Sequence, residues 1–228
     1  MGRGRSGLAL GVALGVCLLA APPASAVTIT FDLDFEFSNG TPPEGPTPWT
    51  TITIDDAADP GGANSVRVTV SNVNLTDAEA VTEISLNFDP LLDPTQVTFT
   101  AVSTSAVASV GFSTGVDAFM ADGDGKFDIL LDLPPPPGNA TGRFTAGETI
   151  VFDLTYVAPI TASSFDFPSA SGGGQGTFRA AAHVQGIGEG DEDSGWIGDA
   201  DVPEPGTLGP MGLGLLALVV ARRRALVR

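Results

Sequence analysis

The heptapeptide DGDGKFD, residues 122–128, holds the side chains whose type and spacing best suit binding chemistry. Asp122, Asp124 and Asp128 bring carboxylate oxygens into a glycine-rich segment, and hard cations such as Ca²⁺ prefer several oxygen ligands around one point. The sequence therefore suggests Ca²⁺ as a cofactor bound by these three aspartates. The alternative is an ordinary turn before an apolar strand, because Asp and Gly are favoured in turns for backbone reasons.

This segment also resembles the calcium-binding EF-hand loop of dockerins, in which an Asp-Gly-Lys step like that of residues 124–126 is common. Alignment on that step places Met120 at the first ligand position and Leu131 at the last. Neither side chain offers an oxygen ligand, so the pattern of a complete EF-hand is absent.

Catalytic chemistry has few candidate residues in this sequence. His183 is the only histidine, and in the stretch AAAHVQG it is in phase with Arg179 and Gln185 rather than with the apolar side chains. One stretch, GFSTG at residues 111–115, matches the pattern G-x-S-x-G, but no helix-like period of 3.6 residues follows it, as a nucleophile elbow requires. One histidine with one cysteine cannot build a zinc site of the usual kind. These features favour a protein that is not an enzyme. A carboxylate pair serving a glycosyl hydrolase stays open, because the chain has 27 acidic residues.

The N-terminus has the pattern of a secretory signal peptide over residues 1–26. Arg3 and Arg5 precede an apolar run, residues 8–21, and Ala24-Ser25-Ala26 is a small-x-small site for signal peptidase. Cys17, the only cysteine, lies within this segment. The mature chain is therefore expected to be exported and to contain no disulfide.

The C-terminus combines three features in order: Val202-Pro203-Glu204-Pro205, an apolar run over residues 208–221, and Arg222-Arg223-Arg224. As a helix the apolar run measures about 21 Å, which is short for a membrane core of ~30 Å. Arginines placed directly after it lengthen the span and stay cytoplasmic, so the body is expected on the periplasmic face of the inner membrane. A simple tail anchor is the alternative.

The three features together resemble the PEP-CTERM sorting signal of Gram-negative bacteria. The resemblance implies recognition by an exosortase, a membrane-embedded transpeptidase-like protease. It also implies transient anchoring in the inner membrane, then release or attachment of the body at the cell surface. Such bacteria usually make exopolysaccharide.

Between its two ends the chain is strongly acidic. Residues 27–202 contain four basic and 26 acidic side chains, a net charge of about −22 against −17 for the whole chain. Such a surface repels nucleic acid, so no nucleic-acid partner is expected.

Alternating apolar and polar residues predict an all-β body. In TITFDLDFEF, for example, Ile29, Phe31, Leu33, Phe35 and Phe37 are expected to share one face. Further strands are predicted at residues 49–54, 65–71, 82–88, 96–102, 126–133, 148–157 and 177–184, with Pro- and Gly-rich turns between them.

Eight or more such strands predict a single antiparallel β-sandwich over residues 27–186. Residues 187–201 form an acidic, Gly-rich segment that is either a final strand carrying Trp196 or a stalk, and residues 202–228 form the sorting signal. From Asn64 to Tyr156 the cues VTVSNV, LNFDPLLDPTQVTF and AGETIVFDLTY resemble the cohesin and carbohydrate-binding class of sandwiches.

Two functions of different classes follow from the sequence. The first is an exported, non-enzymatic protein of the envelope or extracellular matrix, with exosortase and signal peptidase as processing partners. The second is a polysaccharide-binding module that acts on exopolysaccharide, with or without Ca²⁺.

Overall fold

The computed structural model describes residues 27–57, 62–76, 78–104, 107–133, 142–174 and 176–199. The signal peptide and the whole sorting signal, including the apolar run 208–221, lie outside these residues. Within the described ranges no helix is long and apolar enough to cross a membrane.

The described chain is all-β, as the sequence predicted. Its strands are β1 Thr28–Glu36, β2 Thr50–Asp55, β3 Ser65–Asn72, β4 Ala80–Leu86, β5 Thr98–Ser103, β6 Gly111–Ala121, β7 Gly125–Asp132, β8 Phe144–Thr145, β9 Thr149–Thr155, β10 Ala170–Ser171, β11 Ala180–Ile187 and β12 Asp193–Asp199. Two short 3-10 helices, η1 Pro94–Gln96 and η2 Ala162–Phe165, lie in the connections.

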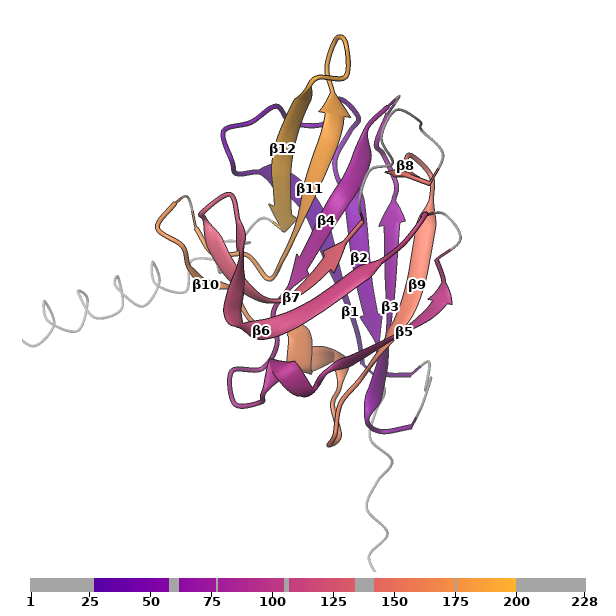
Figure 1. The fold of residues 1–228 in the computed structure, drawn as a ribbon, viewed down its shortest axis with the longest axis vertical. Helices are drawn as coiled ribbons and strands as arrows, with labels where there is room; N and C mark the ends of the chain where they lie inside the picture. The colour runs from indigo at the N-terminus through magenta and orange to yellow at the C-terminus, as the bar shows by residue number, and fades with distance from the viewer. Residues whose placement is uncertain are drawn as a thin grey trace, which may run out of the picture.

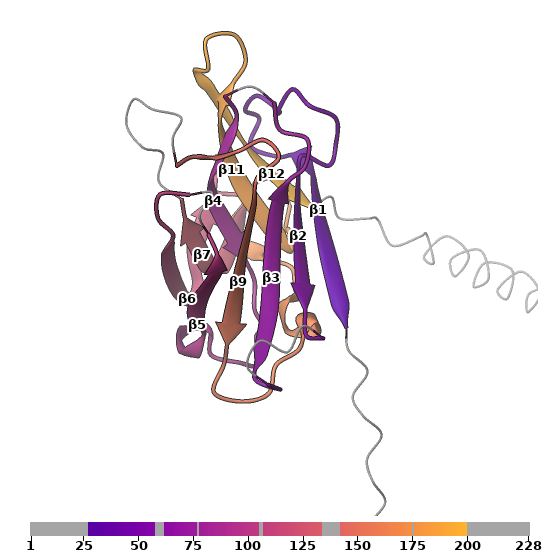
Figure 2. The same cartoon turned by 90° about the vertical axis from the view of Figure 1, so that its right-hand side faces the viewer.

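The strands form one antiparallel sheet that folds over into two layers (Figures 1 and 2). One layer is β1-β2-β3-β9-β5, and the other is β12-β11-β4-β7-β6, with the short strands β8 and β10 beside β4 and β7. The sequence predicted a β-sandwich, and the layered form agrees with it. The hydrogen bonding differs from that of two separate sheets, because β12 pairs with β1 and joins the layers.

The two sides of this folded sheet differ. We call the β12–β1 junction the closed side. On the other side, the open side, each layer ends in a strand with one neighbour only, β5 beside β9 and β6 beside β7. There the layers meet through the rings of Phe99 and Phe112, whose centroids lie 5.4 Å apart.

The main core lies between the layers and follows the alternation in the sequence. Phe31, Ile52 and Val68 come from one layer, and Ile84 and Ile129 come from the other, all at 0–1% exposure. Burial of this apolar area is the main stabilising contribution, at roughly 25 cal/mol per Å² removed from water.

One residue of the first strand departs from the predicted alternation. Phe35 was expected on the inner face with Phe31 and Leu33, but it is 42% exposed. The cause is a register shift between Leu33 and Phe35 in the pairing of β1 with β12. A one-residue shift moves side chains to the opposite face of a strand. Phe37 then packs in a second, smaller apolar cluster with Phe178 and the tip of the β6–β7 hairpin.

The acidic, Gly-rich segment was expected to be either a last strand or a stalk, and residues 193–199 form the strand. β12 lies between β11 and β1, so the sheet extends to Asp199 instead of ending near residue 186. Its last three residues, 197–199, are all buried, as is Gly195, so its burial does not alternate in the simple way of the earlier strands.

Candidate functional site

The aspartates suggested as calcium ligands lie at the β6–β7 hairpin. Asp122 and Gly123 have φ angles of +47° and +82°, and the Asp124 amide donates to the Ala121 carbonyl at 2.9 Å. Two positive φ angles in succession are typical of tight hairpin turns, and Asp followed by Gly is a preferred pair there. The turn alternative therefore accounts for the backbone conformation of this segment.

A second glycine-rich segment covers this turn. The Gly172 amide donates to the Asp124 carbonyl at 2.9 Å. A Cβ at Gly172 would overlap the backbone of Gly123, and one at Gly174 would overlap the Asp124 carboxylate. Asp124 is only 4% exposed as a result. Close packing of one turn on the other therefore explains Gly172 and Gly174, whereas the positive φ angle explains Gly123.

The Asp128 carboxylate binds backbone amides. Its two oxygens accept hydrogen bonds from the amides of Phe88, at 3.1 Å, and Asp117, at 2.9 Å. In the part of the chain that the structure describes, no three Asp, Glu, His or Cys side chains are grouped as metal ligands, these three aspartates included. Calcium binding stays a prediction that this placement does not support.

His183 belongs to a polar row across the outer face of one layer. Directly opposed residues share a face of an antiparallel sheet, and Trp196, His183, Glu83 and Asp132 are opposed in turn on β12, β11, β4 and β7. The His183 and Trp196 rings stack with centroids 4.9 Å apart. The sequence predicted the outward direction of His183 but not its neighbours.

Burial changes the proton affinity of this row. Desolvation lowers the pKa of His183, and the charge of Asp122 opposes that shift. Desolvation raises the pKa of Glu83, and the nearby charge of Asp132 adds to the rise. Burial therefore favours the neutral form of both groups: His183 stays neutral to lower pH, and Glu83 stays protonated to higher pH, than the free side chains do.

The row does not have the geometry of a catalytic triad. The Thr82 hydroxyl lies 3.2 Å from His183 Nδ1, and the nearest Glu83 oxygen lies 3.9 Å from the same nitrogen. In a nucleophile–base–acid relay, the nucleophile and the orienting acid contact opposite nitrogens of the ring. Thr82 is also 4% exposed, which keeps its hydroxyl from a substrate.

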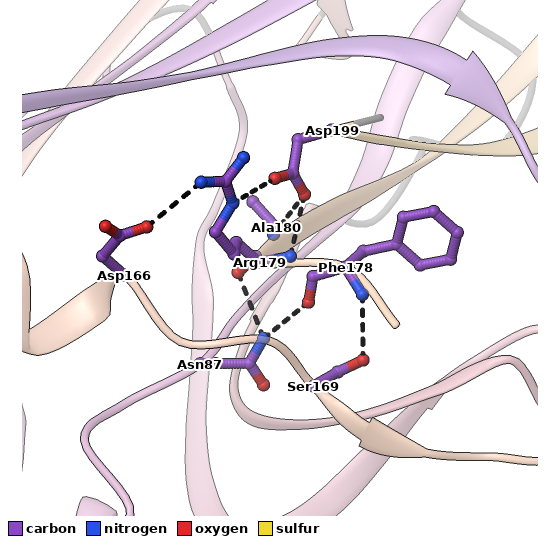
Figure 3. A network of polar contacts seen from close by, with 7 residues as sticks. All are labelled: Asn87, Asp166, Ser169, Phe178, Arg179, Ala180 and Asp199. Atoms are coloured by element: carbon purple, nitrogen blue, oxygen red, sulfur yellow. Dashed lines mark hydrogen bonds and ion pairs between the residues drawn. The ribbon is translucent and has the colours of Figure 1, made fainter. Parts of the chain in front are cut away.

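A network of polar contacts lies on the closed side, where the described chain ends (Figure 3). One oxygen of Asp199 accepts from the backbone amides of Arg179 and Ala180, at 2.8 and 3.0 Å. The other accepts from Arg179 Nε at 2.7 Å. The Arg179 guanidinium also contacts Asp166 at 3.3 Å and lies 5.6 Å from the ring centre of Phe31. These contacts hold the end of β12 against β11.

Asp199 is a buried carboxylate, so its charge carries a desolvation cost. Burial raises its pKa, and the Ala180 amide and Arg179 oppose that rise. A buried charge of this kind persists only when hydrogen-bond donors surround it. Sequence reasoning did not select Arg179 and Asp199. The available signal was an Asp that ends an apolar alternation in a body with only four basic residues.

Comparison with known proteins identifies the C-terminal segment. Residues 201–224 match the family model of the PEP-CTERM protein-sorting motif. The resemblance inferred from Val202–Pro205, the apolar run and the arginines is thus confirmed, although these residues lie outside the described structure. The motif implies export, membrane-anchored sorting and processing by an exosortase.

Comparison of the body gives much less. No curated protein matches the chain. A biomass-sensing module of an Rsgi-like protein of Clostridium thermocellum, described as resembling a family 3 carbohydrate-binding module of the cellulosome, matches with 11% identity and a TM-score of 0.29. The match covers 70% of this chain and 93% of that module. A TM-score this low carries no argument about a ligand.

Proposed function

We propose that this protein is a non-enzymatic β-sandwich of the cell envelope or extracellular matrix, which an exosortase sorts and cleaves at the C-terminal motif. One observation carries the proposal: among the described residues the last one paired in the sheet is Asp199, and the sorting motif begins at residue 201. Every described strand lies before the motif, so cleavage at the motif cuts no described strand.

The contacts of the body support a structural role. Among the acidic side chains suggested for metal binding, Asp128 accepts hydrogen bonds from backbone amides, and Asp122 lies in a tight turn. His183 lacks the relay geometry of a catalytic triad. The closed side fixes the end of β12 through Asp199. A body anchored by its C-terminus transmits any pull to this strand first.

Replacement of Pro203-Glu204-Pro205 by three alanines tests the sorting part of the proposal. We expect the variant to stay in the inner-membrane fraction at its unprocessed mass, measured by fractionation and intact mass spectrometry. Replacement of Pro134, Pro135 and Pro136 by alanine is the control, since it removes three prolines outside the motif. Processing and export of the motif variant at the level of the parent would show that the motif is not the signal.

Polysaccharide binding is the second candidate function, and the Trp196–His183–Glu83–Asp132 row favours it. Aromatic rings provide apolar faces, and carboxylates accept hydrogen bonds from hydroxyl groups. Pull-down on the host exopolysaccharide, with and without Ca²⁺, tests this function. Trp196→Ala should lose retention, and Leu91→Ala, at a side chain 91% exposed elsewhere, should keep it. If the parent protein is not retained under either condition, this function is excluded.

A further inference from the structure

We propose that the open side of the sheet binds the open side of a second copy of this chain, by edge-to-edge pairing along β5. The inference rests on the distribution of charge, on the unpaired edge of β5 and on an exposed apolar side chain at that edge. It is independent of how the chain is sorted.

The charge distribution singles out this side. Charged residues make up 16% of the chain, with a net charge of −17, yet no Asp, Glu, Lys or Arg occurs between Asp93 and Asp117. This uncharged stretch contains all of β5 and the first part of β6. Two copies that meet through other surfaces bring many like charges together, which is unfavourable. The open side lets two acidic bodies touch without that repulsion.

The edge of β5 is available for pairing. β5 is hydrogen-bonded only to β9, from Thr98 opposite Thr155 to Ser103 opposite Val151, and no strand of the described chain pairs with its other edge. All of its residues except the partly buried Phe99 are exposed. An unpaired edge presents free N–H and C=O groups to another strand. A register irregularity between Ala101 and Ser103 limits the regular edge to its first four residues.

The usual protection of edge strands is otherwise missing here. Edge strands commonly carry lysines, inward charges or prolines that prevent pairing with other chains. β5, with the sequence TFTAVS, has none of these. It instead exposes Val102 at 48%. Pairing would bury this apolar side chain, which favours association.

A second copy fits this side better than a partner of another kind. A basic partner would be drawn to the acidic surfaces, and an acidic polysaccharide finds no cation on β5 or the first part of β6. A second copy offers the same uncharged strand, and two β5 strands can pair antiparallel about a two-fold axis. The Phe99–Phe112 contact braces β5 against the other layer, which holds the edge in place for pairing.

The experiment compares two Val→Lys variants of the full chain by sedimentation velocity and light scattering over the micromolar range. The parent should show a concentration-dependent rise in mass from one copy to two or more. Val102→Lys should weaken this association by tenfold or more, the effect of about 1.4 kcal/mol. Val73→Lys should not, although Val73 has nearly the same exposure, 46% against 48%, and the charge change is identical.

Added salt sharpens the test. Salt screens repulsion between the acidic bodies, so parent association should strengthen as ionic strength rises. Far-UV circular dichroism and the melting temperature should be unchanged in both variants, which separates lost pairing from misfolding. A parent that stays at the mass of one copy at every concentration and salt level overturns the proposal. So does equal weakening by Val102→Lys and Val73→Lys.

Discussion

The two layers of this sheet are held together differently on the closed side and on the open side. On the closed side β12 joins the layers, and Asp199 is held by two backbone amides and by Arg179. On the open side the layers meet through Phe99 and Phe112, and the edge strands lack charged residues up to Asp117. The closed side is therefore held by a charged pair, Arg179 and Asp199, at the end of β12. On the open side, the edge strand β5 has no charged residue.

The difference has a functional meaning. The closed side carries the C-terminal end of the body, which the sorting signal follows directly. A buried ion pair is weak evidence for net stability, but removal of one partner is costly because the other charge stays buried. The contacts of Asp199 therefore make the position of the chain end specific. The open side needs no such precision within one molecule, and its edge suits contact between molecules.

The largest expected effect is on the closed side. Asp199→Ala would leave the amides of Arg179 and Ala180 without an acceptor and Arg179 without its nearer carboxylate. We expect a loss of about 3–5 kcal/mol in the free energy of unfolding, measured by urea denaturation. Asp166→Ala removes the more exposed carboxylate from the same guanidinium and should cost less than about 1 kcal/mol. Equal losses would mean that the closed side is not held by Asp199.

A smaller effect is expected in the polar row that lies between the two sides. The pKa of Glu83 is raised by burial and by Asp132. The native carboxyl thus holds its proton to higher pH than the unfolded one, whose value is about 4.5. The stability linked to Glu83 is present below that pH and is lost as pH rises through the folded pKa. Glu83→Gln should therefore raise the melting temperature at pH 7 and change it little at pH 4.

The control for Glu83 is Glu192→Gln in the exposed loop between β11 and β12. It removes the same charge from a strongly acidic chain without removing a partly buried carboxyl. If both variants raise the melting temperature at pH 7 equally, the gain comes from lower overall repulsion. Burial of Glu83 would then have no separate effect.

The smallest expected effect concerns Ca²⁺ at the tip of the β6–β7 hairpin. Asp128 accepts hydrogen bonds from backbone amides, and no three carboxylates of the described residues are grouped there. The melting temperatures in Ca²⁺, Mg²⁺ and EDTA should therefore agree at matched ionic strength. Asp124→Asn should shift all three values equally. A larger rise in Ca²⁺ than in Mg²⁺ that Asp124→Asn abolishes would establish a calcium site. The β6–β7 hairpin would then be held by charge as well.

Much of the fold was predictable from local pattern. The eight strands predicted from alternation correspond to β1, β2, β3, β4, β5, β7, β9 and β11. β6 escaped prediction because its sequence, GFSTGVDAFMA, does not alternate, and its pairing with β7 is irregular between Thr114 and Phe119. The strands β8 and β10 have two residues each, too few to carry a periodic signal.

The candidate sites divide in the same way. The sorting motif was readable because its three parts are contiguous, and the family match confirms it. The sequence did not reveal two other features, the Arg179–Asp199 contact and the Trp196–His183–Glu83–Asp132 row. Their members lie far apart in the sequence and come together only in the folded sheet. Spacing along the chain does not say which strands become neighbours. The aspartates of DGDGKFD are close in sequence, but in the described structure they are not grouped as metal ligands.

The sequence by itself determined the all-β class, the acidic body and the sorting signal, since each depends on residue types and on local order along the chain. Only the tertiary structure decided that the Gly-rich segment forms β12, which joins the two layers, and that β5 lies at an edge. It also decided that Asp128 accepts hydrogen bonds from backbone amides. The physical reason is that strand pairing is non-local. A strand can satisfy its backbone with any compatible neighbour, and packing of the whole chain selects which one.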